Sequence, residues 1–181
     1  TSKTLNTGDT IGIFQCESEG ARRTLNKLKA RTVRDLAVAN AFFKPGPSTG
    51  GMANAFVRRY RGEAKVTYLH QALEPILGPT YGILLFQEQI LRVATEIAGM
   101  SWQQAGFLRR GMSKMKHSEM SDMRDAFIKG CQRPEPDGPA FSNGQAEQLW
   151  EQVEAFSGYG FNQGHATAYA NVSYRTAYVR A

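Results

Sequence analysis

The feature that most constrains the fold is a run of apolar residues at helical spacing near the middle of the chain. Its members are Ile90, Val93, Ala94, Ile97 and Ala98. Because they recur every three or four residues, they lie on one face of a helix. Gly99 follows at once, and a glycine there is typical of a left-handed helix end. A helix of this kind buries its stripe against other elements, so the chain needs a packed core.

Similar stripes run through most other segments, which indicates a mainly α protein. We expect about eight or nine helices in a globular multi-helix lobe with little or no strand. Ile11, Ile13 and Gln15 alternate with other residues, and this run is interpreted as a short strand or a buried loop. Residues 132–144 hold three prolines and two glycines, which predicts a long loop. The chain starts at Thr1 and ends within an apolar-periodic run, so we expect residues 1–181 to be one domain cut from a longer chain.

The charge balance indicates the class of partner. Lys and Arg number 22 against 16 Asp and Glu, which gives a formal charge of +6 and a pI near 9.5. A chain this basic attracts polyanions, so nucleic acid or a nucleotide is the first partner to consider. Cys16 and Cys131 have neither disulfide-framework nor zinc-ligand spacing, which favours a reducing compartment. No apolar run approaches the ~20 residues of a membrane span. We therefore expect a cytoplasmic protein without a membrane partner.

A helix is predicted to begin at Ser101. Ser101 and Gln104 have the three-residue spacing of a capping box, in which each side chain bonds the backbone N–H of the other residue. The buried stripe of this helix would be formed by Trp102, Ala105, Leu108 and Met112.

The end of the same helix is strongly cationic. Phe107–Lys116 places four cations within ten residues. Arg109 lies at the edge of the buried stripe and Arg110 further out, and each guanidinium offers planar bidentate donors to phosphate oxygens. Lys114 extends the positive field beyond the helix. The arrangement predicts an anion site, whereas a solvated charged face is the alternative.

Gly158–Tyr169 is the second informative stretch, with three glycines ahead of a helix that runs to the end. A glycine-rich approach leaves the first N–H groups of a helix free for anions. The side chains that offer flat surfaces to a base are Tyr159, Phe161, His165 and Tyr169. The alternative is that Tyr159 and Phe161 anchor the core and that His165 bonds a backbone carbonyl.

Short motifs are spread over nearly the whole chain. They are Gly8–Gln15 with Glu17-Ser18, Lys44-Pro-Gly-Pro47, Thr80-Tyr-Gly82, Phe86-Gln-Glu-Gln89, Ala98-Gly99, Leu108-Arg-Arg110, Phe156 with Gly158–Asn162, and His165 with Ala168-Tyr169. In this order they resemble the C-family of bacterial replicative DNA polymerases, the alpha subunits of DNA polymerase III. One such motif is weak, but the ordered set is highly specific. The segment resembles the fingers domain, a largely helical part that follows the palm.

The resemblance implies template-directed addition of deoxynucleotides to a DNA primer. In that family, palm aspartates hold two Mg²⁺ ions and the fingers hold the incoming triphosphate. Those aspartates lie upstream of Thr1, so the resemblance assigns no catalytic residue and no metal ligand to this segment, which is expected to be inactive by itself. The implied partners are primer-template DNA, a deoxynucleoside triphosphate and, through the parent chain, the sliding clamp and other replisome subunits.

The motifs also carry residue roles. Arg109 and Arg110 match the family's arginine pair that contacts the triphosphate, and Lys114 matches a neighbouring basic position. His165 and Tyr169 match positions near the nascent base pair.

The chain departs from the family pattern at three points. Lys44 stands where the family has Arg before Pro-Gly-Pro. From the residues alone, this stiff loop beside a basic helix end predicts contact with a nucleic-acid backbone, and a simple helix stop and turn is the alternative. Ser113-Lys114-Met115 replaces Gly-Lys-Lys, and Gln163-Gly164 replaces Lys-Ser. Positive groups near the nucleotide are thus fewer. Either neighbouring residues compensate, or the chain is a divergent or accessory member.

Two other functions are considered. Basic faces on several helices fit a non-catalytic helical module that binds nucleic acid or a clamp. One such face is made by Arg22, Arg23, Lys27 and Lys29. A hydrolase that uses His165 with Glu88 as its base lacks a nucleophile in a strand-turn-helix context.

Overall fold

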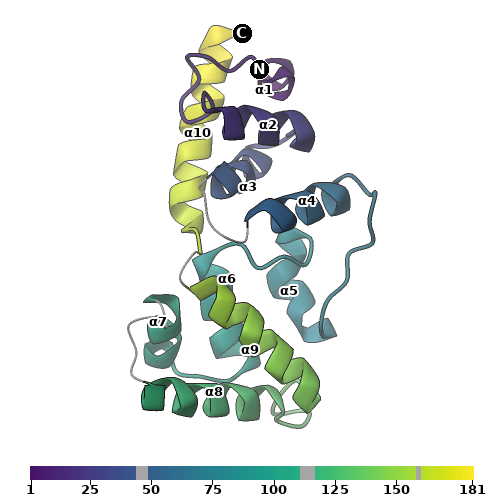
Figure 1. Cartoon of the computed structure of the whole chain (residues 1–181), viewed down its shortest axis with the longest axis vertical. Coiled ribbons are helices and arrows are strands. Elements are labelled where there is room, and N and C mark those ends of the chain that lie inside the picture. Colours follow the sequence, from purple (N-terminus) through teal and green to yellow (C-terminus); the bar gives the residue numbers. More distant parts are fainter. Residues whose placement is uncertain (44–48, 111–116, 158–159) are drawn as a thin grey trace. The chain divides into compact units, whose positions relative to one another are not determined.

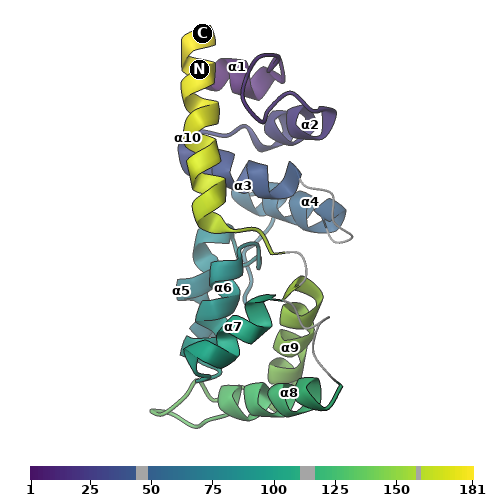
Figure 2. The same ribbon diagram turned by 90° about the vertical axis from the view of Figure 1, so that its left-hand side faces the viewer.

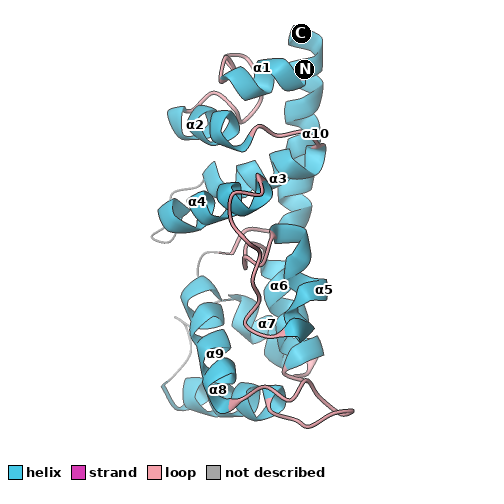
Figure 3. Cartoon of the chain, turned by 90° about the vertical axis from the view of Figure 1, so that its right-hand side faces the viewer, coloured by secondary structure: helices cyan, strands magenta, loops and turns pink. Residues whose placement is uncertain are grey.

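The computed structural model describes residues 1–43, 49–110, 117–157 and 160–181 (Figure 1). Within these ranges it has ten α-helices, two 3₁₀ turns and one π-helical turn, and no strand (Figure 3). The predicted mainly α class is therefore confirmed. The helix that the sequence pattern did not predict is the short α1 (Ser2–Thr7). Among the described residues, no helix is both long and apolar enough to cross a membrane.

The described chain forms two compact units. The first unit comprises Thr1–Lys65 together with Phe161–Ala181, and the second unit comprises Val66–Gly160. The last helix of the chain therefore shares its core with the first part of the sequence, and the second unit is inserted between them.

The first unit contains five helices: α1, α2 (Glu19–Leu28), α3 (Val33–Phe43), α4 (Thr49–Tyr60) and α10 (Gln163–Arg180). α10 packs along α3, as two views of the ribbon show (Figures 1 and 2). The residues that α10 buries are all small: Ala166, Ala170, Ser173 and Ala177. Because they recur every three or four residues, they form one smooth stripe, which lets neighbouring backbone approach closely.

The alternating stretch before α2 is a loop. Ile13 is fully buried, whereas Ile11 is 64% exposed. The loop is held on α10, because the Phe14 N–H donates to Thr176 Oγ1 at 3.1 Å and the Ser173 hydroxyl donates to the Phe14 carbonyl at 2.9 Å. These bonds satisfy backbone groups that a strand would have paired in a ladder. Of the two interpretations, the strand is wrong and the loop with a buried anchor is confirmed.

The second unit contains the remaining elements. They are η1 (Gln71–Leu73), α5 (Glu74–Leu77), η2 (Gly78–Thr80), α6 (Gln87–Arg92), η3 (Val93–Ile97), α7 (Trp102–Arg110), α8 (His117–Cys131) and α9 (Asn143–Ser157). Its core is built from large side chains, among them Ile90, Leu108, Phe127 and Trp150. Phe127 and Trp150 meet edge to face with ring centroids 5.3 Å apart, which the aromatic quadrupoles favour. Residues 132–142 form the loop between α8 and α9.

The stripe over residues 90–98 is buried as predicted, although its helix is not a plain α-helix. At Val93, α6 gives way to the π-helical turn η3, in which the Ala98 N–H donates to the Val93 carbonyl at 3.0 Å. The spacing of the apolar residues does not distinguish this wider turn from an α-helix, because all five residues of the stripe are still buried. Gly99 has a φ of 63°, which confirms the left-handed end.

Gly130 marks the place where α8 touches the end of η3. A Cβ at this position would lie 1.8 Å from the Ala98 carbonyl oxygen, so only glycine fits. Arg133 joins the same two helix ends, since its Nε donates to the Gly130 carbonyl at 2.9 Å and its Nη2 to the Ile97 carbonyl at 3.4 Å. One guanidinium thus satisfies terminal carbonyls of two segments.

A buried glutamine links α6 to the turns before it. Gln89 is 5% exposed. Its Oε1 accepts from the N–H groups of Leu85 and Phe86 at 2.8 and 2.9 Å. Its Nε2 donates to the Ile76 carbonyl at 3.2 Å and to Thr80 Oγ1 at 2.7 Å. An amide with four partners is fully satisfied, so the motifs around Thr80 and Gln89 have a structural role.

Candidate functional site

α7 carries the predicted arginine pair at its C-terminal end. The capping box forms as predicted: the Ser101 N–H donates to Gln104 Oε1 at 2.9 Å, and the Gln104 N–H donates to Ser101 Oγ at 3.2 Å. Ala105 and Leu108 are fully buried. Because the helix is held at its start by the box and along its length by the core, its last turn has a defined position.

Trp102 does not belong to the buried stripe. Its side chain is 71% exposed, so that prediction is wrong. Trp102 is the first residue of α7, and the helix reaches the core only from its second turn onward, through Ala105 and Leu108.

The two arginines differ in exposure as predicted, with Arg109 half-buried and Arg110 exposed. The Arg110 guanidinium carbon lies over the ring of Phe107, 4.9 Å from its centroid. This cation–π contact orients the guanidinium without occupying its N–H donors. In the part of the chain that the structure describes, neither arginine forms an ion pair with a carboxylate. Both therefore keep donors for an anion.

Some predicted residues fall outside the described ranges. They are Lys44, Met112, Lys114 and Tyr159. The assignments of Lys44 and Lys114 stay predictions. The predicted residues that the structure describes are Arg109 and Arg110 on α7 and His165 and Tyr169 on α10.

α10 begins behind an asparagine cap. The Asn162 Oδ1 accepts from the His165 N–H at 2.7 Å. His165 is exposed in the first turn, and its ring centroid lies 3.9 Å from that of Tyr169 and 5.6 Å from that of Phe161. The predicted pair is thus brought together, since Tyr169 lies one turn further along the same face.

Phe14 extends this group, and sequence reasoning missed it. Its ring centroid lies 5.1 Å from that of Tyr169, and the residue is 36% exposed. Phe14 comes from the loop before α2, so no spacing pattern links it to α10. The docking of that loop on α10 brings it there. We call Phe161, His165, Tyr169 and Phe14 the ring row.

The predicted residues therefore fall into two sets, one in each unit. Arg109 and Arg110 belong to the second unit, and His165 and Tyr169 belong to the first. The hydrolase hypothesis joins His165 with Glu88, which lies in α6 of the second unit. Among the described residues, the His165 ring contacts aromatic rings.

Neither cysteine is a ready nucleophile. Both are buried. Burial raises the pKa of the Cys131 thiol to about 12, and the nearby positive charge of Arg133 only partly opposes this. Burial also raises the pKa of Cys16, against a hydrogen bond with Ser173 that lowers it. Since the thiolate is the reactive form, the cysteines supply no nucleophile for hydrolysis at neutral pH.

Possible metal ligands are scattered over the described residues. Within those ranges, no group of three or more His, Cys, Asp or Glu side chains is placed to hold a metal ion.

Comparison with known proteins gives a consistent result. Residues 1–135 match the model of the bacterial DNA polymerase III alpha subunit finger domain. The chain is 40% identical over its whole length to a DNA polymerase III subunit alpha of Pseudomonas fluorescens, of which it covers 15%. It is 38% identical over 98% of its length to the protein of that name from Halalkalibacterium halodurans, of which it covers 15%. The corresponding values for Helicobacter pylori strain 26695 are 39%, 98% and 14%.

Proposed function

This chain belongs to the finger-domain family of the bacterial DNA polymerase III alpha subunit, and from that premise we propose a specific role for it. Membership makes the chain a component of a DNA polymerase that acts in DNA replication. Within that polymerase, it binds the incoming deoxynucleoside triphosphate and the nascent base pair during template-directed primer extension.

The observation that carries the proposal is the arginine pair at the end of α7. Leu108 is buried and holds the last turn in place, while Arg109 and Arg110 have no carboxylate partner within the described residues. A triphosphate tail presents several anionic oxygens, and guanidinium groups bind such oxygens bidentately. Lys114 is proposed to add a third positive charge to the same tail.

The ring row is proposed to contact the nascent base pair. His165 is exposed and Tyr169 half-buried, so both present surface to a ligand. Stacking of a base on an aromatic side chain contributes about 1–3 kcal/mol. Lys44 is proposed to contact the nucleic-acid backbone.

The chemical step is proposed to lie outside this chain, which spans about 15% of the length of the relatives that it matches. Palm carboxylates with bound Mg²⁺ would supply the phosphoryl-transfer chemistry. The residues of this chain bind and orient the nucleotide, and the chain alone is expected to be inactive. The proposed partners are primer-template DNA and, through the parent polymerase, the sliding clamp and other replisome subunits, all in the cytoplasm.

The test uses the polymerase that carries this chain, with Arg109→Ala and Arg110→Ala made separately. Each charged hydrogen bond contributes roughly 1.5–3 kcal/mol, so we expect the KM for the nucleotide to rise by about tenfold to a hundredfold. Arg124→Ala on α8 is the matched control, because it removes an arginine from the same unit, and it should leave KM unchanged. Steady-state primer extension over a range of nucleotide concentrations measures this. An unchanged KM in both α7 variants would refute the assignment.

The competing function is a non-catalytic module that binds nucleic acid or a clamp. It is favoured by the basic faces of the first unit, and it predicts salt-sensitive DNA binding with no dependence on triphosphate. The effect of Arg109→Ala separates the two, with DNA binding followed by fluorescence anisotropy and nucleotide binding followed with a fluorescent deoxynucleoside triphosphate. If Arg109→Ala weakens DNA binding and leaves nucleotide binding intact, the competing function is the better one.

A further inference from the structure

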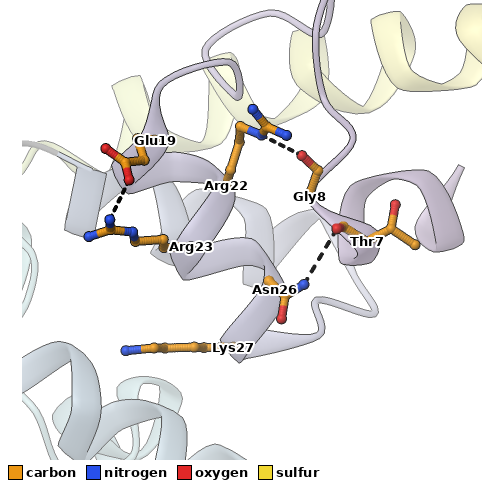
Figure 4. A pocket seen from close by; sticks show the side chains of 7 residues that line it. All are labelled: Thr7, Gly8, Glu19, Arg22, Arg23, Asn26 and Lys27. Atoms are coloured by element: carbon orange, nitrogen blue, oxygen red, sulfur yellow. Dashed lines mark hydrogen bonds and ion pairs between the residues drawn. The ribbon is translucent and has the colours of Figure 1, made fainter.

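A polar hollow of about 370 Å³ lies between the end of α1 and one face of α2 in the first unit (Figure 4). It is lined by Thr7, Gly8, Glu19, Arg22, Arg23, Asn26 and Lys27. The wall towards α1 is held by two bonds, from Arg22 Nε to the Gly8 carbonyl at 2.6 Å and from Asn26 Nδ2 to the Thr7 carbonyl at 3.4 Å. The hollow therefore has a structured rim, and its lining carries three cations against one carboxylate, that of Glu19.

Two cations of the hollow, Arg23 and Lys27, are available to bind an added ligand. Arg23 and Lys27 are one turn apart on α2, so their side chains extend from the same side of the helix (Figure 4). Lys27 has no hydrogen bond or ion pair within the described residues. Arg23 pairs with Glu19, but the two side chains are 72% and 78% exposed. A pair this exposed contributes little, so an anion can replace Glu19 as the partner of Arg23.

The unit around the hollow is strongly basic. By sequence, the first unit holds 14 Lys and Arg against 5 Asp and Glu, a formal charge of +9. The second unit holds 8 against 11, a formal charge of −3. The positive potential that attracts a polyanion is therefore a property of the first unit, and the hollow lies within it.

We propose that the hollow and the exposed cations of α2 bind the phosphodiester backbone of duplex DNA. The lining offers charged donors and no aromatic ring, so it fits phosphate groups and not bases, and the contact is independent of sequence. The choice of DNA among polyanions rests on the proposed function. The site is distinct from the arginine pair of α7, which lies in the other unit.

The test measures binding of the 181-residue chain to a short fluorescein-labelled DNA duplex by fluorescence anisotropy. The variant is Arg23→Gln with Lys27→Gln, which removes two charges and keeps good helix formers. Arg22 is left in place because it bonds the α1 backbone. Two lost phosphate contacts should reduce the magnitude of the negative slope of log K against log salt by about 1.8. With binding at 1 M salt unchanged, this weakens binding about sixtyfold at 0.1 M salt. Circular dichroism should show an unchanged thermal midpoint, since both side chains are exposed.

The matched control is Arg124→Gln with Lys129→Gln on α8, which removes the same charge from the second unit and should leave the slope unchanged. An equal change in both double variants, or no change in the α2 variant, would overturn the proposal. The proposal would also be overturned if poly-glutamate displaced the labelled DNA as effectively as unlabelled duplex does. The surface would then bind any polyanion and have no preference for a phosphodiester backbone. The α2 variant in the parent polymerase should keep its KM for nucleotide, so this proposal and the triphosphate assignment fail independently.

Discussion

The two units are proposed to attract anions in different ways. The first unit spreads its excess of positive charge over several helices, and the second unit has a formal charge of −3 yet carries Arg109 and Arg110 side by side at one helix end. Spread charge gives salt-dependent contact with any phosphate backbone, whereas an oriented guanidinium pair recognises one group in one geometry. The overall charge of +6 thus combines a basic first unit with an acidic second unit, and the two proposed kinds of recognition become distinct only when the units are considered separately.

The two units also contain contrasting helix contacts. In the first unit, α10 buries a stripe of small residues such as Ala170. In the second unit, α8 and α9 meet through the large rings of Phe127 and Trp150. The α10 stripe is therefore expected to be sensitive to enlargement and the Phe127–Trp150 contact to truncation, because close-packed interiors tolerate neither voids nor excess volume.

The largest effect is expected for Trp150→Ala in the second unit. Trp150 is 2% exposed, and removal of a buried tryptophan lowers the free energy of unfolding by about 3–5 kcal/mol. Trp102→Ala is the matched control, since Trp102 is 71% exposed and its loss should cost no more than about 0.5 kcal/mol. Urea denaturation followed by circular dichroism measures both. Equal losses for the two tryptophans would contradict the assigned core.

A smaller loss is expected for Ala170→Leu in the first unit. Ala170 is fully buried in the α10 stripe, and extra volume in a packed seam lowers the free energy of unfolding by about 1–3 kcal/mol. The exposed Ala168 on the same helix provides the control, and Ala168→Leu should be nearly neutral. Urea denaturation also tells whether the units unfold together: if they do, Ala170→Leu and Trp150→Ala shift the same transition. A stabilised Ala170→Leu variant would show that the seam is loosely packed.

The smallest effect concerns pH and the buried thiol of Cys131. Its folded-state pKa is raised by burial from the ordinary 9.0 to about 12. A raised pKa contributes stability that is complete below pH 9 and is lost as the pH rises towards 12. At pH 10 the loss is expected to be on the order of 1 kcal/mol relative to neutral pH.

The measurement for Cys131 compares two unfolding free energies, at pH 7 and pH 10, in the native chain and in Cys131→Ala. The variant lacks the titrating group, so its stability should fall less between the two pH values, whatever other groups contribute. An identical fall in both proteins would mean that the thiol ionises equally easily in the folded and unfolded states.

Local signals in the sequence located most helices and the arginine pair correctly. The capping-box spacing of Ser101 and Gln104 predicted the start of α7. The apolar stripe through Leu108 predicted which side of α7 faces the core. These features succeed because a cap or a stripe depends on residues within a few positions of one another. The prediction that Trp102 is buried was wrong, because the exposure of a hydrophobic residue at the first position of a helix depends on the surrounding structure and not on periodicity.

What the sequence alone determined about this protein is its helical class, the position of the cationic helix end and, through ordered motifs, its family. The tertiary structure decided the rest. It placed Phe14 beside Tyr169, gave Gly130 its contact with Ala98, and divided the charge between two units. Caps and stripes depend on residues only a few positions apart in the sequence. The features that the sequence did not predict arise where segments far apart in the chain pack together, and no local pattern determines which segments will meet.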